Sequence, residues 1–173
     1  MRFPLPLLLA CCLGACSKES TDSPAAPSTA SSGLPATLFP ETTPPEGQDV
    51  ETVKKTAKAG DQVVLAAQVG GRKQWQVPGK AIFLVIDPVL ESCDEMEGDD
   101  CPTPWDFCCV PKDQVTAKLA TVRVVGADGE PLSASVEGAH GVAPLKHVVV
   151  QGTVQRNDES GLVLDATSIW VKS

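Results

Sequence analysis

Over most of the chain, apolar residues recur in short runs that are closed by glycine, proline or polar turns. Two runs, at 61–71 and 80–88, are almost continuously apolar and rich in β-branched residues, which is typical of strands buried on both faces. A third run, at 119–132, alternates and reaches an Asp-Gly turn signal, and the stretch 146–171 indicates two strands joined by a polar turn. Five principal strands without a long helix between them favour a closed antiparallel barrel or sandwich.

The N-terminal part of the chain has a different pattern. Residues 17–48 are dominated by Ser, Thr, Ala and Pro, with few large apolar residues, which predicts a flexible tether. A short helix is expected next, with Asp49 as its N-cap and Gly60 placed to end it, although its apolar face is small. We therefore divide the chain into a signal peptide, a tether that includes this helix, and a barrel domain, at 1–15, 16–59 and 60–173.

The first sixteen residues predict export and lipid anchoring. Arg2 precedes an apolar run from Phe3 to Leu13, which is too short to span a bilayer and has the length of a signal-peptide core. The run ends in Leu-Gly-Ala-Cys, which resembles the bacterial lipobox and implies a lipidated Cys16. An ordinary secretory signal with an incidental cysteine is the alternative. We expect a cell-envelope protein, anchored to a membrane through Cys16 and facing the periplasm or the exterior.

The order of the expected strands resembles the OB-fold of bacterial proteins labelled tRNA-anticodon-like or nucleic-acid-binding OB domains. The block "CPTPWDFCC", Cys101 to Cys109, is similar to one in small secreted or lipid-anchored proteins of planctomycete-type bacteria. The resemblance covers residues 60–173. It implies an all-β fold, a five-stranded OB-like antiparallel barrel with a long cysteine-rich loop between strands 2 and 3, and it carries over no activity.

The charge of the chain argues against nucleic acid as a partner. The sequence has 14 Lys and Arg against 22 Asp and Glu, and residues 60–173 alone hold nine basic and sixteen acidic residues. Nucleic-acid binding draws most of its affinity from the neutralisation of phosphates. OB-folds that bind single strands also stack bases on aromatic side chains. Here Phe83 lies in a core-like run, and the three tryptophans are scattered over the sequence, at Trp75, Trp105 and Trp170.

No motif indicates catalysis. The sequence has no phosphate-binding glycine loop of the usual spacing, no HExxH and no nucleophile elbow. His140 lies in a Gly-rich stretch and His147 precedes a strand-like run, so we interpret both as surface or turn residues rather than general bases. We expect a protein that is not an enzyme and needs no cofactor.

The densest chemistry lies in "ESCDEMEGDDCPTPWDFCCVP", Glu91 to Pro111. An even number of cysteines in an exported domain predicts disulfides, here two among Cys93, Cys101, Cys108 and Cys109. We favour bonds from Cys93 and Cys101 to the adjacent pair. Such bonds would fasten the connection of about thirty residues between the second and third strands, which is long for a loop without a core.

Two alternatives for the cysteines stay open. Four thiolates could bind zinc, and the neighbouring carboxylates could attract harder ions such as calcium. However, the spacing C-x7-C-x6-C-C lacks the CxxC knuckle of structural zinc sites, and thiol redox centres also favour CxxC. The sequence therefore predicts disulfides and no metal, with a metal-binding or thiol-redox protein as the alternative.

Trp105, Asp106 and Phe107 lie between the prolines and the paired cysteines of this block. The first interpretation is a small core, with both rings packed under the loop or over the barrel end, because exposed rings are costly. The alternative is an interaction patch, in which an aromatic anchor beside an acidic rim binds a cationic protein or peptide.

The sequence as a whole predicts a non-catalytic, lipid-anchored binding or structural module, with an envelope protein or peptide as its partner. A second alternative is the binding of single-stranded nucleic acid or an oligosaccharide through the barrel face.

Overall fold

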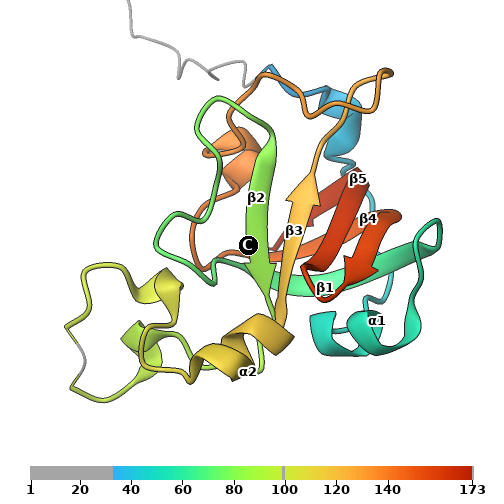
Figure 1. Ribbon diagram of the computed structural model, residues 1–173. Coiled ribbons are helices and arrows are strands. Elements are labelled where there is room, and N and C mark those ends of the chain that lie inside the picture. Colours follow the sequence, from blue (N-terminus) through green and yellow to red (C-terminus); the bar gives the residue numbers. More distant parts are fainter. Residues whose placement is uncertain (1–32, 99, 173) are drawn as a thin grey trace, which may run out of the picture. The chain divides into compact units, whose positions relative to one another are not determined.

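The β-sheet of the computed structural model closes on itself (Figure 1). The structure describes residues 33–98 and 100–172, so the expected signal peptide, Cys16 and the first part of the tether lie outside it. Five strands follow one another around the barrel in the order β1-β2-β3-β5-β4. They are β1 (Gln62–Val69), β2 (Ile82–Ile86), β3 (Leu119–Arg123), β4 (His147–Asp158) and β5 (Gly161–Val171). The expected all-β, five-stranded OB-like barrel is confirmed.

One neighbouring pair of strands corrects the expectation of an antiparallel barrel. β3 pairs with β5 in parallel, from Ala120 opposite Leu162 to Arg123 opposite Asp165, whereas the other four pairs of neighbours are antiparallel. The reason is geometric. Strand direction cannot alternate all the way around a closed ring with an odd number of strands, so at least one pair must run in parallel. The barrel is therefore mixed.

The alternation within each strand fills the barrel. In β1 the inward residues Leu65, Ala67 and Val69 are buried, and in β2 Phe83 and Val85 are fully buried. The longer strands β4 and β5 contribute valines and leucines to the same core cluster. Because side chains alternate between the two faces of a strand, the neighbouring positions face outward, where a ligand or a loop can reach them.

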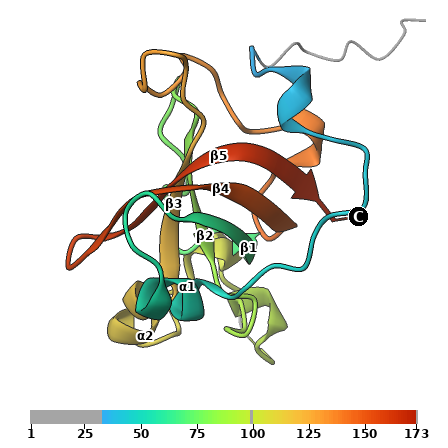
Figure 2. The same ribbon diagram turned by 90° about the vertical axis from the view of Figure 1, so that its right-hand side faces the viewer.

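The folded part of the chain begins before residue 60, which corrects the boundary of the tether. The short 3-10 helix η1 (Ala36–Leu38) places Leu38 in the core, and Phe39 follows it there. The α-helix α1 (Val50–Thr56) buries Val50 and Val53 completely. Figure 2 shows this segment running beside the barrel from η1 to α1. The composition of the segment is tether-like, but its few large apolar residues are the ones that the barrel buries.

The predicted helix after Asp49 is confirmed. The Asp49 carboxylate accepts the Thr52 backbone N–H at 2.6 Å, as expected of an N-cap. The helix ends at Thr56 rather than at Gly60, because Ala57 already has an extended backbone.

Both views place α1, the connection between β2 and β3, and the helix α2 (Lys112–Ala117) at one end of the barrel (Figures 1 and 2). The same connection contains two 3-10 helices, η2 (Cys93–Glu95) and η3 (Pro104–Asp106). The connection between β3 and β4 carries the 3-10 helix η4 (Ala139–Gly141). Within the described residues, no helix is both long enough and apolar enough to cross a membrane.

Candidate functional site: the cysteine loop and the adjacent hollows

The predicted long connection between β2 and β3 is present, and we call residues 87–118 the cysteine loop. Its first turn is held by Ser92, whose N–H and hydroxyl both donate to the Glu95 carboxylate, at 2.7 and 2.8 Å. This turn positions Cys93 at the start of η2, where it is fully buried. The loop therefore has local structure of its own and is not an irregular, extended connection.

The loop is fastened to the barrel around Gly70 and Gly71, which follow β1. The Gly71 N–H donates to the Trp105 carbonyl oxygen at 2.8 Å, and the Trp105 indole N–H donates to the Lys73 carbonyl oxygen at 3.1 Å. A Cβ atom at position 70 would lie 2.7 Å from the Trp105 carbonyl oxygen, so the close approach requires a residue without a side chain.

The rings of Trp105 and Phe107 pack against the protein and do not project into solvent. Phe107 is only 1% exposed and forms a small core with Ile86 and Val115, and half-buried Trp105 packs against the barrel core. Asp106 turns the other way and accepts hydrogen bonds from the Thr103 hydroxyl and the Cys108 N–H, each at 2.9 Å. These contacts agree with the small-core interpretation and leave no exposed aromatic anchor at Phe107.

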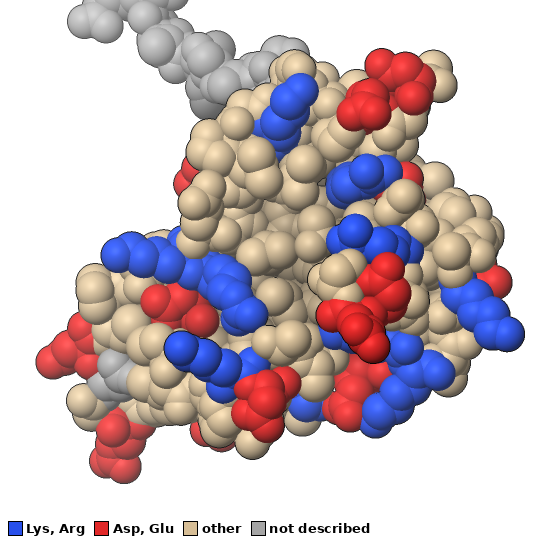
Figure 3. Space-filling model, in the orientation of Figure 1, with Lys and Arg blue, Asp and Glu red and all other residues tan. Residues whose placement is uncertain are grey.

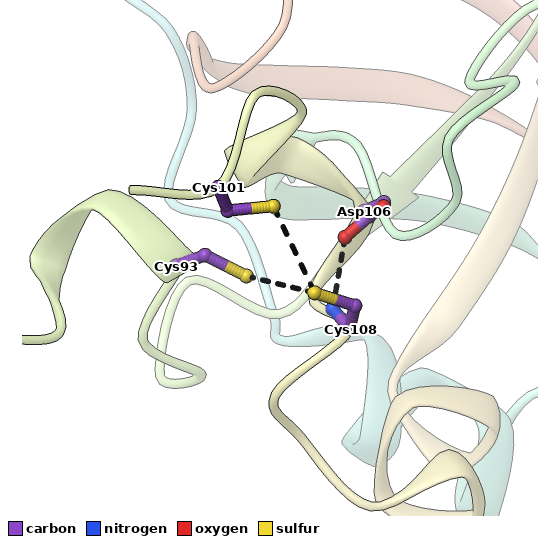
Figure 4. Close-up of side chains that lie close together, drawn as sticks. All are labelled: Cys93, Cys101, Asp106 and Cys108. Carbon is purple, nitrogen blue, oxygen red and sulfur yellow. Dashed lines mark hydrogen bonds between the residues drawn. The ribbon is translucent and has the colours of Figure 1, made fainter. Parts of the chain in front are cut away.

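The four cysteines lie close together in the loop, and Figure 4 shows three of them, Cys93, Cys101 and Cys108. The Cys108 sulfur lies 3.6 Å from that of Cys93, 3.8 Å from that of Cys101 and 3.9 Å from that of Cys109. These separations exceed the length of an S–S bond, about 2.05 Å. The two expected disulfides therefore stay a prediction.

The surroundings of Cys93 and Cys108 shift their pKa values in opposite directions. Burial alone would raise the pKa of Cys93, but the Cys109 N–H and the Cys108 thiol favour its thiolate and hold that pKa below its ordinary value. The Cys108 pKa is raised, because its thiol has acceptors on several sides, first Cys93 and then Cys101 and Asp106.

A hollow of about 420 Å³ lies over the outer face of β2 and β3. Figure 3 shows it as a depression with Lys and Arg side chains on its rim. Its floor includes the half-buried, outward-facing side chains of Ile82, Leu84 and Thr121. Arg72 and the 41%-exposed Val77 also line it.

A second hollow, of about 500 Å³, lies between the segment that follows β1 and the cysteine loop with α2, and Arg72 lines it as well. Lys73 and Lys112 add two more cations to its wall, next to Asp106 and Cys108 of the cysteine loop. Arg72 donates to uncharged groups, the Gly71 carbonyl oxygen at 2.9 Å and the Thr116 hydroxyl at 3.4 Å.

Sequence reasoning missed the residues that line the hollow over β2 and β3, such as Val77, Ile82 and Leu84. The signal was the apolar character of β2 on both of its faces: in a barrel, the outer face of such a strand needs a cover or a ligand.

No family model and no curated protein matches the sequence. Among solved structures, the chain is similar to "OBody AM1L10 bound to hen egg-white lysozyme", with 14% identity and a TM-score of 0.40. The similarity covers 76% of this chain and 97% of that chain. Likeness at this level carries no argument about function.

Proposed function

We propose that this protein is a lipid-anchored, non-catalytic binding module of the cell envelope, which holds its ligand in the hollow over β2 and β3. The observation that carries the proposal is the outward-facing apolar floor of that hollow, made by Ile82 and Leu84. Outward positions on a solvated barrel are ordinarily polar, so an apolar floor favours a surface that a partner covers. Lipidation at Cys16 supplies the membrane anchor.

The lining of the hollow favours an extended peptide segment of an envelope protein as the ligand. Val77, Ile82 and Leu84 offer aliphatic surface to side chains of the peptide, and Gln74 and Thr121 offer polar groups. The guanidinium of Arg72 suits a carboxylate on the ligand. Nucleic acid fits less well, because Trp75 and Phe83 are buried and provide no platform for stacking bases.

Trp105, Asp106 and Phe107 do not form the binding surface in this proposal. Phe107 is buried and the Asp106 carboxylate accepts hydrogen bonds from Thr103 and Cys108 within the loop, so these residues support the loop beside the hollow.

Site-specific photo-crosslinking in intact cells tests the proposal, and two exposed valines provide a matched pair. Val77 lines the hollow and is 41% exposed, whereas Val89 is 71% exposed in the cysteine loop and is not among the residues that line the hollow. A photo-reactive residue at position 77 should yield discrete protein adducts in the envelope fraction, and the same residue at position 89 should not.

A blocking variant provides the second arm. Thr121→Arg places a long side chain on the floor of the hollow and should remove the adducts formed at position 77. Adducts that persist in this variant, or that form equally at position 89, would contradict the proposal. Adducts to glycan instead of protein would favour the oligosaccharide alternative. A Cys16→Ser variant should leave the membrane fraction if Cys16 is the anchor.

A further inference from the structure

Three sulfurs and one carboxylate meet at a single point in the cysteine loop (Figure 4). The ligand atoms of Cys93, Cys101, Cys108 and Asp106 all lie within 4.8 Å of one another. Two of the sulfur–sulfur separations, from Cys108 to Cys93 and to Cys101, are 3.6 and 3.8 Å. The residues come from η2, from η3 and from the segments that flank η3.

The two sulfur–sulfur separations from Cys108, 3.6 Å to Cys93 and 3.8 Å to Cys101, are those of a tetrahedral zinc site. A zinc–thiolate bond is about 2.3 Å long, and the edge of a tetrahedron is about 1.6 times its centre-to-corner distance, so bound sulfurs lie about 3.8 Å apart. A carboxylate oxygen at about 2.1 Å from zinc lies slightly closer to each sulfur. We propose that Cys93, Cys101, Cys108 and Asp106 form a zinc-binding site.

The arrangement of the sulfurs favours a metal over two disulfides. Two disulfides divide four sulfurs into two separate pairs, whereas here the Cys108 sulfur lies within 4 Å of two other proposed ligands, Cys93 and Cys101, at once. Sulfurs that converge on a common point, rather than in pairs, are the arrangement that one shared cation requires. The fold thereby overcomes the lack of a CxxC knuckle in the sequence.

The local backbone holds the two ligands Asp106 and Cys108 in place. Phe107 has a left-handed conformation, with φ of 55°, and its buried ring anchors the turn against Ile86 and Val115. Asp106 and Cys108, on either side of it, both face the other two sulfurs (Figure 4). Strain of this kind at a non-glycine residue is common where a site must be held in one geometry.

Asp106 also has the partner that a ligating carboxylate needs. The Thr103 hydroxyl donates to its Oδ2 atom at 2.9 Å, and the Cys108 N–H donates to Oδ1 at the same distance. Such outer contacts orient a carboxylate toward a metal.

The set of three sulfurs and one oxygen selects zinc among the common cations. Calcium and magnesium prefer oxygen ligands throughout, and Cu(I) prefers sulfur alone. Zinc accepts both, and a site closed by four protein ligands is a structural one. The bound ion would join η2 to η3 and so fasten the cysteine loop, the role that the sequence had suggested for disulfides. This inference is independent of the proposed function, because Ile82 and Leu84 of the hollow take no part in it.

The test uses the full-length protein, purified in detergent under reducing conditions without chelator. Metal analysis should find one zinc per chain. Replacement by Co²⁺ should give the thiolate-to-cobalt absorption of a tetrahedral site. Cys93→Ser, Cys101→Ser and Cys108→Ser should each abolish stoichiometric binding. Thr103→Val, which leaves all four ligands in place, should weaken zinc binding about 10- to 100-fold.

Cys109→Ser is the matched control, since it removes the sulfur next to Cys108 in the chain, which is not one of the four proposed ligands. It should keep one zinc per chain, whereas Asp106→Asn should weaken binding and alter the cobalt spectrum. If Cys109→Ser loses its zinc and Asp106→Asn keeps it unchanged, the assignment is overturned. Binding of Cu(I) with an affinity that Asp106→Asn does not change would also overturn it. A chain that takes up no zinc after reduction, and whose unreduced mass is lower by four hydrogens, would overturn the site in favour of two disulfides.

Discussion

The buried carboxylate of Asp87, directly after β2, accepts the backbone N–H of Val50 in the first turn of α1. Its other oxygen accepts the Glu51 N–H at 3.2 Å and lies 3.6 Å from the Lys118 ammonium. The free N–H groups at the start of a helix favour an anionic acceptor. Asp87 is therefore a second cap on α1, besides Asp49, and ties the N-terminal segment to the end of the barrel where the cysteine loop begins.

Removal of this cap should destabilise the protein. Asp87→Ala leaves the N–H of fully buried Val50 without its acceptor, which we expect to cost about 2 kcal/mol of unfolding free energy. Asp87→Asn keeps one oxygen acceptor and should cost less. Urea unfolding at pH 7, followed by far-UV circular dichroism, measures both values. Equal stability of Asp87→Ala and the wild type would show that the contact contributes nothing.

Asp87 should also make stability depend on pH. Burial raises its pKa above the ordinary 3.8, even though two backbone N–H groups favour the ionised form. The folded protein therefore binds this proton more tightly than the unfolded chain, and the stabilisation is lost as pH rises from about 3.8 through the raised pKa. The unfolding free energy of the wild type relative to Asp87→Asn should fall over that range.

The contribution of Glu51 to the unfolding free energy should depend on pH in the opposite direction to that of Asp87. Lys118 and Lys55 lower its pKa from 4.5 to about 2, so its contribution is present above 4.5 and lost as pH falls toward 2. A difference curve for Asp87→Asn that rises with pH would contradict the assignment of Asp87.

The contrast between Asp49 and Asp87 shows what the sequence could predict. Asp49 directly precedes α1 and accepts the N–H of Thr52, three residues away, so local pattern alone identified it. Asp87 lies 37 residues from Val50, and only the barrel brings them together. The strands were predictable for the same reason as Asp49, because alternation and turn residues are local signals. Closure of five strands requires a parallel pair, but that this pair is β3 with β5 depends on the order of the strands around the barrel.

The candidate sites divide in the same way. The sequence marked Cys93, Cys101 and Cys108 by composition and by the expectation of export, but their convergence depends on the buried turn at Phe107. The floor of the hollow depends on the pairing of β2 with β3, which sets Leu84 opposite Thr121. Neither the convergence of the cysteines nor the pairing of Leu84 with Thr121 can be predicted from spacing along the chain.

Phe39 should be necessary for stability, although the composition around it is that of a tether. It is only 8% exposed, and its ring stacks on that of His140 with centroids 4.3 Å apart. Phe39→Ala should lower the unfolding free energy by about 3 kcal/mol, because it leaves a cavity against the barrel. Exposed Thr43 is the control, and Thr43→Ala should change stability by less than about 0.5 kcal/mol. A domain that starts at residue 60 should be less stable than the intact chain.

Gly70 should be required for docking of the cysteine loop. A methyl group there would lie 2.7 Å from the Trp105 carbonyl oxygen and 3.3 Å from the Phe107 ring. Gly129 also has a positive φ, but a Cβ atom there would have nothing within 4 Å. Gly129→Ala therefore measures the cost of backbone strain without a steric clash. Gly129→Ala should cost about 1 kcal/mol, and Gly70→Ala clearly more. Faster proteolysis within residues 87–118 in Gly70→Ala alone would identify loop release, and equal costs would refute it.

The parallel ladder between β3 and β5 carries a charged pair whose coupling can be measured. Arg123 lies opposite Asp165 and donates two hydrogen bonds to it, from Nε at 2.7 Å and from Nη2 at 2.8 Å. Both side chains are less than a quarter exposed, so solvent screens them less than an open surface pair. A double-mutant cycle with Arg123→Ala and Asp165→Ala should give a coupling free energy of about 1 kcal/mol. Arg123→Lys should recover only part of it, because an ammonium cannot form the two-pronged contact. A coupling near zero would show that closure of the barrel rests on the backbone ladder and the core alone.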